Sequence, residues 1–261
     1  MSSETFLVNE VDIANINIGT LKTSERGGIS QGFINFNGSA LRLQLPKMYM
    51  PYGISDNIKF IKDETENKKY WINLSFGDYE SNSKYAELKS LIEGINEKII
   101  DNACENHQAW FKKPFKSREI VEEKFNSSII YSKDKSTGEI KNDYPPTFKV
   151  NLKGINDNIT TKFFDSSRNE IDDVFTKKTK GTNIITIIYG KLWISSSGFG
   201  ISWKVDQAQI FLNNATGNCI IKNNDDEQEE DIEDNTNLEN VNNSVDNLKI
   251  DTNIEDSDDD L

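Results

Sequence analysis

Residues 223–261 confine the folded part of this chain to the residues that precede them. The segment holds 16 acidic residues and one lysine, a net charge of −15, and has no aromatic residue. Residues 1–222 hold 29 basic and 27 acidic residues together with every tryptophan, tyrosine and phenylalanine. A segment with so little apolar surface cannot offset the entropy lost on ordering. We therefore predict a folded body over residues 1–222 and a disordered acidic tail over residues 223–261.

Short alternating runs predict that this body is mainly β. Leu41, Leu43 and Leu45 alternate with polar residues, which is the period of a half-buried strand. Similar short runs, rich in Ile, Val, Thr and aromatic residues, recur with turn signals between them, which favours a closed or nearly closed antiparallel barrel. The expected strands lie at residues 69–76, 129–132, 147–152, 160–164, 184–189, 192–195, 201–205 and 208–212.

One or two helices are expected beside the barrel. Over residues 84–104 apolar residues recur at spacings of three and four, from Leu88 to Ala103, and Ser83 offers an N-cap. A shorter helix is predicted over residues 118–125, capped by Ser117. The apolar face of the longer helix also offers a surface through which two copies could form a homodimer.

The residue types argue against an enzyme, a cofactor or a metal centre. His107 is the only histidine, so a His-rich metal site cannot form, and a His-based catalytic triad would depend on this one residue. No glycine-rich segment ends in the Gly-Lys-Ser/Thr of a phosphate-binding loop. The acidic run at residues 225–234 lacks the glycine and the spacing of a calcium loop.

The same composition indicates a protein of a reducing, intracellular setting without a membrane partner. Residues 1–16 do not combine a basic start with an apolar run, as a secretory signal would. No stretch approaches the roughly 20 apolar residues of a membrane span. The two cysteines, Cys104 and Cys219, make no disulfide framework.

Aromatic and basic residues are interspersed in the predicted hairpin of residues 189–205. Phe199, Ile201, Trp203 and Val205 share one strand face, and Ser202 and Lys204 share the other. Two interpretations stay open: the Phe199 face is core, or a tryptophan lies at a groove where bases stack. The candidate DNA-binding residues of this hairpin are Lys191, Trp193, Phe199, Trp203 and Lys204.

A second aromatic–basic cluster lies at residues 110–118, where Pro114 prevents a continuous helix. It is either a solvated connection with long lysine side chains or a basic loop that contacts nucleic acid. Lys47 beside Tyr49, and Lys149 beside Phe148, repeat the pattern more weakly. Together they predict a positive groove on a near-neutral body, with the further candidates Lys112, Lys113, Lys116, Arg118, Lys47, Tyr49 and Lys149.

Four phrases of the sequence resemble a known family. They are LPKMYMPYGIS at residues 45–55, HQAWFKK at 107–113, YPPTFK at 144–149, and KLW at 191–193 followed by FGISWKVDQ at 199–207. This pattern is similar to the single-stranded-DNA-binding proteins of large eukaryotic DNA viruses, which in turn resemble an OB-fold single-stranded-DNA-binding protein of phage replisomes. The resemblance extends over most of residues 40–212.

The resemblance implies an OB-fold barrel that coats single strands during viral DNA replication, recombination or repair. It also implies an acidic tail that contacts a replicative polymerase or helicase, and a location at replication sites in an infected cell, either nuclear or cytoplasmic. Related tails commonly end in an aromatic residue, whereas this chain ends in leucine. The residues expected to contact the partner are Asp256, Asp258, Asp259, Asp260 and Leu261.

Two functions of different classes therefore follow from the sequence. The first is a non-enzymatic, sequence-independent single-stranded-DNA-binding protein whose tail competes with DNA for the groove and recruits replication proteins. The alternative is an acidic-tailed chaperone or scaffold for basic proteins such as histones or virion core proteins. The two differ in where affinity resides, because a chaperone loses its partner when the tail is removed.

Overall fold

A computed structural model describes most of the predicted body. It covers residues 4–23, 28–63, 66–112, 114, 117–134, 136–141, 143–156 and 158–212. The acidic tail, and the boundary predicted after residue 222, lie outside the described residues. No helix within the described ranges is long and apolar enough to cross a membrane.

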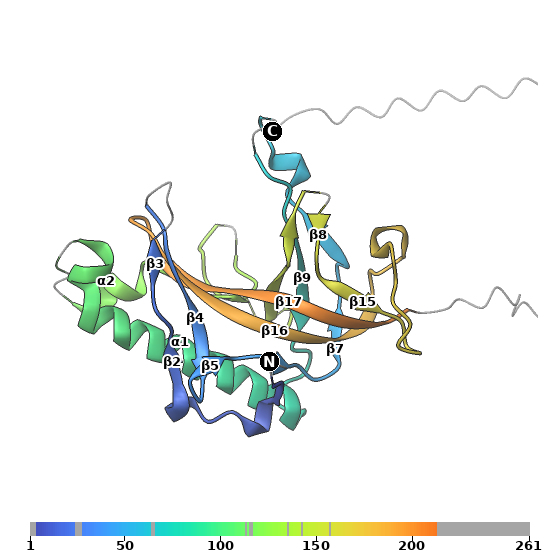
Figure 1. Ribbon diagram of the computed structural model, residues 1–261, viewed down its shortest axis with the longest axis horizontal. Coiled ribbons are helices and arrows are strands. Elements are labelled where there is room, and N and C mark those ends of the chain that lie inside the picture. Colours follow the sequence, from blue (N-terminus) through green and yellow to red (C-terminus); the bar gives the residue numbers. More distant parts are fainter. Residues whose placement is uncertain are drawn as a thin grey trace, which may run out of the picture. The chain divides into compact units, whose positions relative to one another are not determined.

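Five strands close into a barrel (Figure 1). Starting at β7 (Met48–Met50), each strand pairs with the next: β9 (Tyr70–Ser75), β12 (Thr147–Leu152), β17 (Phe199–Phe211) and β16 (Thr182–Ile194), which pairs back with β7. The order and the single parallel pair, β12 with β17, are those of the OB fold. The prediction of a mainly β, OB-fold-like barrel is confirmed, with one parallel pairing in an otherwise antiparallel ring.

Shorter strands extend this barrel. β4 (Ser30–Phe36) and β6 (Leu43–Gln44) pair with β16, and β8 (Ile54–Asp56) pairs with β9. A small hairpin of β13 (Gly154–Ile155) and β14 (Asn158–Ile159) follows β12. The remaining strands are β1 (Phe6–Leu7), β2 (Ile16–Ile18), β3 (Lys22–Thr23), β5 (Ser39–Ala40), β10 (Phe125–Asn126), β11 (Ile129–Ile130) and β15 (Lys162–Phe164).

The long hairpin of β16 and β17 merges four of the predicted strands into two. Along β16, buried and half-buried residues alternate without a break, so one face is core and the other is open. Ile187 pairs with Gln207 and Ile188 with Val205, which leaves Asp206 as the extra residue of a β-bulge. The bulge lets both strands stay paired over their whole length while the hairpin bends around the barrel.

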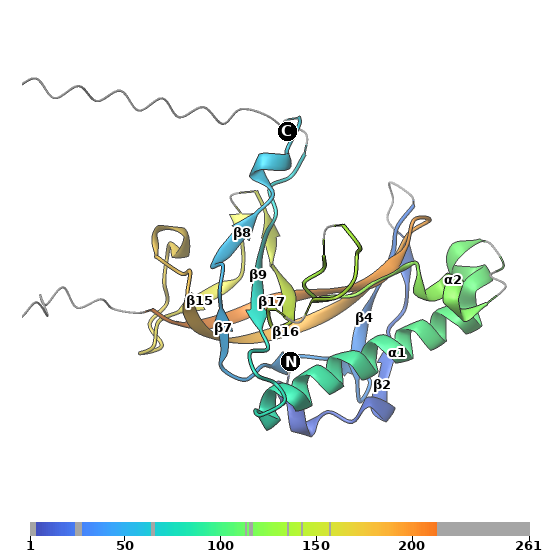
Figure 2. The same ribbon diagram turned by 180° about the vertical axis from the view of Figure 1, so that it is seen from behind.

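The predicted long helix is α1, Ser83–Phe111, and it packs against β17 and the N-terminal segment (Figure 2). Asn82, rather than Ser83, is the N-cap, and its side chain accepts a hydrogen bond from the Lys84 amide. The apolar face that could have served a homodimer is buried within the chain, because Leu88, Ile92 and Ile95 are fully covered. The second helix, α2, is shorter than predicted and spans Arg118–Glu122.

Large aromatic side chains fill the barrel. Trp203 and Phe148 are fully buried and meet edge to face, with ring centroids 6.0 Å apart. Gly190 of β16 gives Trp203 its space, since a Cβ there would lie 3.0 Å from both the Trp203 ring and Ile34. The barrel interior is therefore a packed core, and ligands must bind on its outer face.

A buried and an exposed phenylalanine test this assignment of the core. Phe148→Ala should lower the free energy of unfolding by about 3–5 kcal/mol, because it empties the centre of the barrel. Phe60→Ala serves as the control, since Phe60 is 76% exposed and its loss should stay within about 0.5 kcal/mol. Urea unfolding followed by circular dichroism measures both, and equal effects would contradict the core described above.

Candidate nucleic-acid interface

The outer face of the barrel brings aromatic, amide and basic side chains of five adjacent strands together. Cross-strand partners place Lys191 between Phe33 and Ser202. In the next row Tyr189 lies opposite Lys204, Lys204 opposite Asn151, and Asn151 opposite Trp71. At the usual spacing of strands, the face from β4 through β16, β17 and β12 to β9 is about 19 Å wide.

Two adjoining hollows lie over this face and form one groove. Their volumes are about 570 and 420 Å³, and they share Ile29, Gln31 and Lys191. Neither hollow is lined by an aspartate or a glutamate, although the chain has 43 acidic residues. We call this the basic groove; its other lining residues are Gly19, Thr20, Lys22, Thr23, Gly32, Phe33 and Asn35 in the first hollow, and Lys69, Tyr70, Asn151, Leu152, Gly154, Ile155, Trp193, Ser202 and Lys204 in the second.

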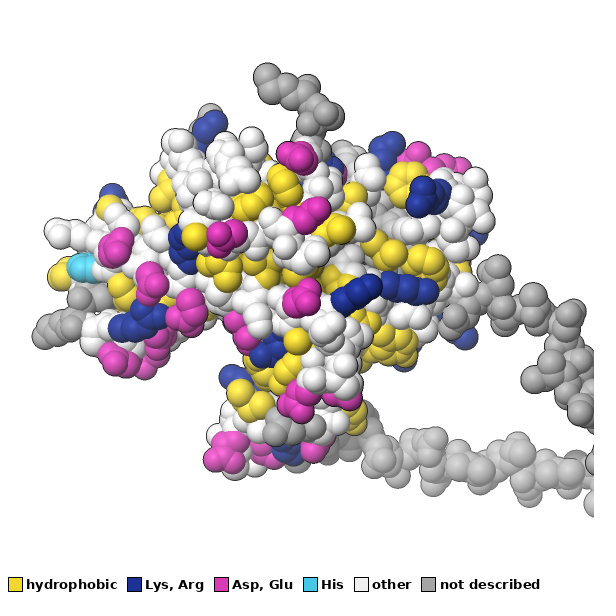
Figure 3. Space-filling view, turned by 90° about the horizontal axis from the view of Figure 1, so that it is seen from below, with side chains coloured by type: hydrophobic (Ala, Val, Ile, Leu, Met, Phe, Trp, Pro, Cys, Tyr) yellow, Lys and Arg dark blue, Asp and Glu magenta, His cyan; other side chains and the backbone are white. Residues whose placement is uncertain are grey.

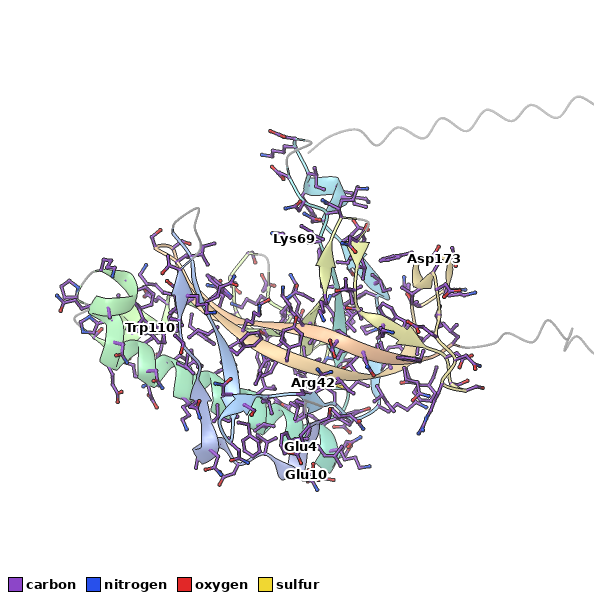
Figure 4. All side chains as sticks on the ribbon, in the orientation of Figure 1. Glu4, Glu10, Arg42, Lys69, Trp110 and Asp173 are labelled. Atoms are coloured by element: carbon purple, nitrogen blue, oxygen red, sulfur yellow. The ribbon has the colours of Figure 1, made fainter. Side chains whose placement is uncertain are left out.

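Two projections flank the groove. Figures 1 and 2 show the β3–β4 hairpin and the arm of residues 51–69 rising on the same side of the long hairpin, and Figure 4 labels Lys69 near the base of the arm. The β13–β14 hairpin braces the arm: the Asn156 amide donates to the carbonyl of Lys68 at 2.9 Å, and the Lys68 amide donates to Asn156 Oδ1 at 2.8 Å. The groove therefore has a sheet floor and side walls held by hydrogen bonds.

The lysines of this face have no carboxylate partner among the described residues. Lys69, Lys149, Lys191 and Lys204 make no ion pair there. Two of them lie over aromatic rings instead: Lys191 Nζ is 4.6 Å from the centre of the Phe33 ring, and Lys149 Nζ is 4.4 Å from the centre of the Trp71 ring. These contacts hold the ammonium groups on the face and leave them available to an anion.

Burial, together with neighbouring positive charge, lowers the pKa of two of these lysines. Burial lowers the pKa of Lys204 most, and the charges of Lys191 and Lys153 lower it further. Burial likewise lowers the pKa of Lys149, with the charge of Lys69 adding to the effect. In the empty groove the charged forms are therefore disfavoured, and an anion bound there would relieve this cost.

Several aromatic rings of the face are open to a ligand. Phe33 is 42% exposed and lies 6.1 Å from the Tyr189 ring, and Trp193 and Trp71 are half-buried. Flat rings beside unpaired cations are the surface on which bases stack while phosphates are neutralised. Four predicted residues, Lys149, Lys191, Trp193 and Lys204, are thus brought to one face.

The structure removes Phe199 and Trp203 from the candidates. Both are fully buried, and Phe199 packs among the rings of Phe111, Phe125 and Trp110. The prediction that they bind DNA is wrong, and the core interpretation of their strand face holds. The physical reason is the alternation of β17, which turns every second side chain into the barrel.

The second predicted cluster lies apart from the basic groove. Lys112 caps the end of α1 and is exposed, but it lines neither hollow. Arg118 forms ion pairs with Glu97, Asp101 and Glu122, so its charge is already neutralised. Figure 3 shows acidic side chains gathered around basic ones at this end, and Figure 4 labels Trp110 there. Arg118 is therefore a poor phosphate ligand, while Lys113 and Lys116 lie outside the described residues.

Lys47 and Tyr49 lie near the other end of the long hairpin. Tyr49 pairs with Asn183, eight residues along β16 from Lys191, which is about 26 Å at the rise of a strand. Lys47 Nζ lies 3.9 Å from the centre of the Phe211 ring. The structure does not bring these two residues together with the basic groove.

Sequence reasoning missed four residues of this face: Phe33, Lys69, Trp71 and Tyr189. Lys69 and Trp71 were placed only in the strand predicted at residues 69–76, and Tyr189 only in the strand predicted at 184–189. Phe33 was not a binding candidate. The available signal was the strand period itself, since Trp71 alternates with the buried Ile72 and Phe33 with the buried Ile34. The pairing that brings them beside Lys191 and Lys149 is long-range, and no local pattern encodes it.

Residues 77–218 match the model of DUF5871, a family of unknown function. The match covers more than half of the chain. The chain belongs to this family. No curated protein matches it in sequence. The family segment contains α1, β12, β16 and β17, which supply most of the groove floor, whereas β4 and β9 precede it.

Solved structures that resemble the chain are phage single-stranded-DNA-binding proteins. One is gp2.5 of bacteriophage T7, with 13% identity and a TM-score of 0.41, covering 70% of this chain and 98% of its own. Another is the protein of bacteriophage Enc34 in complex with single-stranded DNA, with 10% identity and a TM-score of 0.39, covering 76% of this chain and 97% of its own. A further structure of the Enc34 protein has 12% identity and a TM-score of 0.37, covering 80% of this chain and 98% of its own.

Replacing a crowded lysine should stabilise the protein. Because the folded state lowers the pKa of Lys204 below its ordinary value of 10.5, the charged lysine costs stability at neutral pH, and that cost fades as pH rises above the lowered pKa. Lys204→Met should therefore melt at a higher temperature than the wild type at pH 7 and low salt, with a smaller difference near pH 10.5. Lys178→Met, at an exposed position, is the control, and a Lys204→Met variant less stable at pH 7 would contradict the prediction.

Proposed function

We propose that this protein binds single-stranded DNA, without base specificity, in the basic groove. The observation that carries the proposal is the groove itself: two adjoining hollows lined by lysines and aromatic rings and by no carboxylate. In an OB fold the face of the second and third strands, with the loops beside it, binds oligonucleotides. Here those strands are β9 and β12, which contribute Trp71, Lys149 and Asn151.

The lysines supply affinity through the phosphates. Lys69, Lys191 and Lys204 line the groove, and Lys149 lies on the same face. None of the four has a carboxylate partner among the described residues, so binding replaces counterions of the strand. Four phosphate contacts predict a slope of about −3 for the logarithm of the association constant against the logarithm of salt concentration. The bound phosphates would also offset the burial and the neighbouring positive charge that lower the pKa of Lys204.

The aromatic rings supply contacts that every base can make. Stacking on a ring is worth about 1–3 kcal/mol per base and differs little between bases, because all have a flat π-face. Trp71, Trp193, Phe33 and Tyr189 are the rings available on this face. We propose roles in DNA replication, recombination or repair on this basis, with no chemical reaction by the protein itself.

The acidic tail has a role in the same proposal. It carries a net charge of −15 on a body of +2, and the groove is the carboxylate-free surface that such a segment fits by charge. The tail would occupy the groove in the absence of DNA and be displaced when a strand binds. The released tail, including Asp256, Asp258–Asp260 and Leu261, would then recruit a polymerase or helicase.

Tryptophan fluorescence distinguishes the groove from the rest of the body. Oligo-dT should quench the wild type, and Trp193→Ala and Trp71→Ala should each lose part of the quenching and about 1–3 kcal/mol of binding free energy. Trp110→Phe is the matched control. Trp110 lies at the end of α1 and packs against Phe199, so its replacement should leave both quenching and affinity unchanged. Equal losses in all three variants would place the strand outside the groove.

The tail model has a separate test. A chain ending at Lys222 should bind oligo-dT several-fold more tightly than the full chain at low salt, with the difference shrinking as salt screens the tail. A full-length chain whose 16 tail carboxylates are replaced by amides should behave like the truncated one. Equal affinities of all three at low salt would remove the competition, and loss of a basic protein partner on truncation would favour the chaperone alternative.

A further inference from the structure

Asp206 is the only acidic residue in the five strands that form the groove floor. Strand alternation would send the residue after Val205 outward and the next one inward, but Asp206 is the extra residue of the bulge. Consequently Lys204, Asp206 and Gln207 are all half-buried residues outside the core. A carboxylate therefore lies two residues from Lys204, in strands whose other charged residues are all lysines.

This carboxylate is shared between two basic residues. Arg42 Nη2 donates to Asp206 Oδ2, and Lys153 Nζ donates to Asp206 Oδ1 at 3.2 Å. The Asp206 side chain is 15% exposed, that of Arg42 25% and that of Lys153 42%. Lys153 is therefore the most accessible member of the cluster, and it is bound by the less exposed carboxylate of Asp206.

Lys153 lies at the edge of the groove. Its chain neighbours Leu152 and Gly154 both line the groove, and its backbone amide is fixed by a 2.7 Å hydrogen bond to Thr161 Oγ1. Its positive charge contributes to the lowered pKa of Lys204, so the two ammonium groups act on the same region. Without Asp206, Lys153 would be a further cation available to the strand.

We propose that Asp206 masks Lys153 from the bound strand and so limits the affinity and salt dependence of the groove. The inference rests on the proposed function of the groove. A phosphate that reaches Lys153 must compete with a carboxylate already in place, whereas a phosphate at Lys191 or Lys204 meets no such competitor. Asp206 thereby weakens the hold on the strand enough for its release, because its carboxylate already engages the Lys153 ammonium group.

Charge-neutral replacement of Asp206 tests the proposal in the full-length protein. Asp206→Asn should bind oligo-dT about three- to tenfold more tightly at low salt, and its salt slope should steepen by about 0.7, the value for one added phosphate contact on a single strand. Glu170→Gln is the matched control: it also removes one negative charge and frees a lysine, Lys162, but in a pair 3.3 Å long outside the groove. An equal gain in both variants would overturn the proposal.

Lys153 itself gives a second, independent measurement. Lys153→Met should change the affinity of the otherwise wild-type protein by less than about twofold, since the lysine is already engaged, and it should abolish the gain of Asp206→Asn in the double variant. A loss in Lys153→Met as large as that in Lys204→Met would overturn the masking role. This single variant decides the matter even where Asp206→Asn loses its fold through the stranded Arg42.

Binding by the wild-type protein distinguishes a failure of the groove's proposed function from a failure of the role of Asp206. Failure of the wild-type protein to bind oligo-dT at low salt would overturn the function proposed for the groove, and this inference with it. Binding by the wild type, together with an Asp206→Asn variant that is folded and no tighter than Glu170→Gln, would overturn the role of Asp206 alone.

Discussion

The pairing of β16 with β17 is the constraint on which both the core and the groove depend. Each strand runs for 13 residues, and each pairs with several shorter strands along its length. Every second side chain enters the barrel, where Trp203 meets Phe148, and the intervening ones face outward, where Lys191 and Lys204 lie. A slip of one residue in either strand would exchange these two sets, so core packing also fixes the composition of the groove.

Electrostatics in the body follow a division between paired and unpaired cations. Near α1 and α2, Arg118 is held by three carboxylates, and on the loop after β11 Lys141 pairs with Asp134. On the groove floor the lysines are instead held by rings and by partial burial, and the pKa of Lys204 and Lys149 is lowered. A set of cations left without partners costs stability, which is typical of a binding surface and not of a structural one.

Asp206 lies where the cations that have carboxylate partners meet the lysines that have none. It is a paired carboxylate beside an unpaired lysine face, and its place depends on one extra residue in β17. Bulges are common next to binding sites, and here the extra residue itself carries the carboxylate that neutralises Lys153 and Arg42 together. The carboxylate that limits the groove thus lies at a local irregularity of an otherwise regular hairpin.

The sequence by itself determined the division of charge between residues 1–222 and the tail, the mainly β body, and the long helix with its buried face. Composition gives the division of charge directly, and the spacing of apolar residues gives the strands and the helix, because these are local properties of the chain. It also placed Lys191, Trp193 and Lys204 in one hairpin, yet it left open which face of that hairpin was core. Only the tertiary structure decided that Trp203 is buried and Trp193 is not, and that Phe33 and Trp71 lie on the same outer face as the groove. The reason is that alternation defines two faces of a strand, whereas long-range pairing alone decides which face is covered and which residues lie opposite one another.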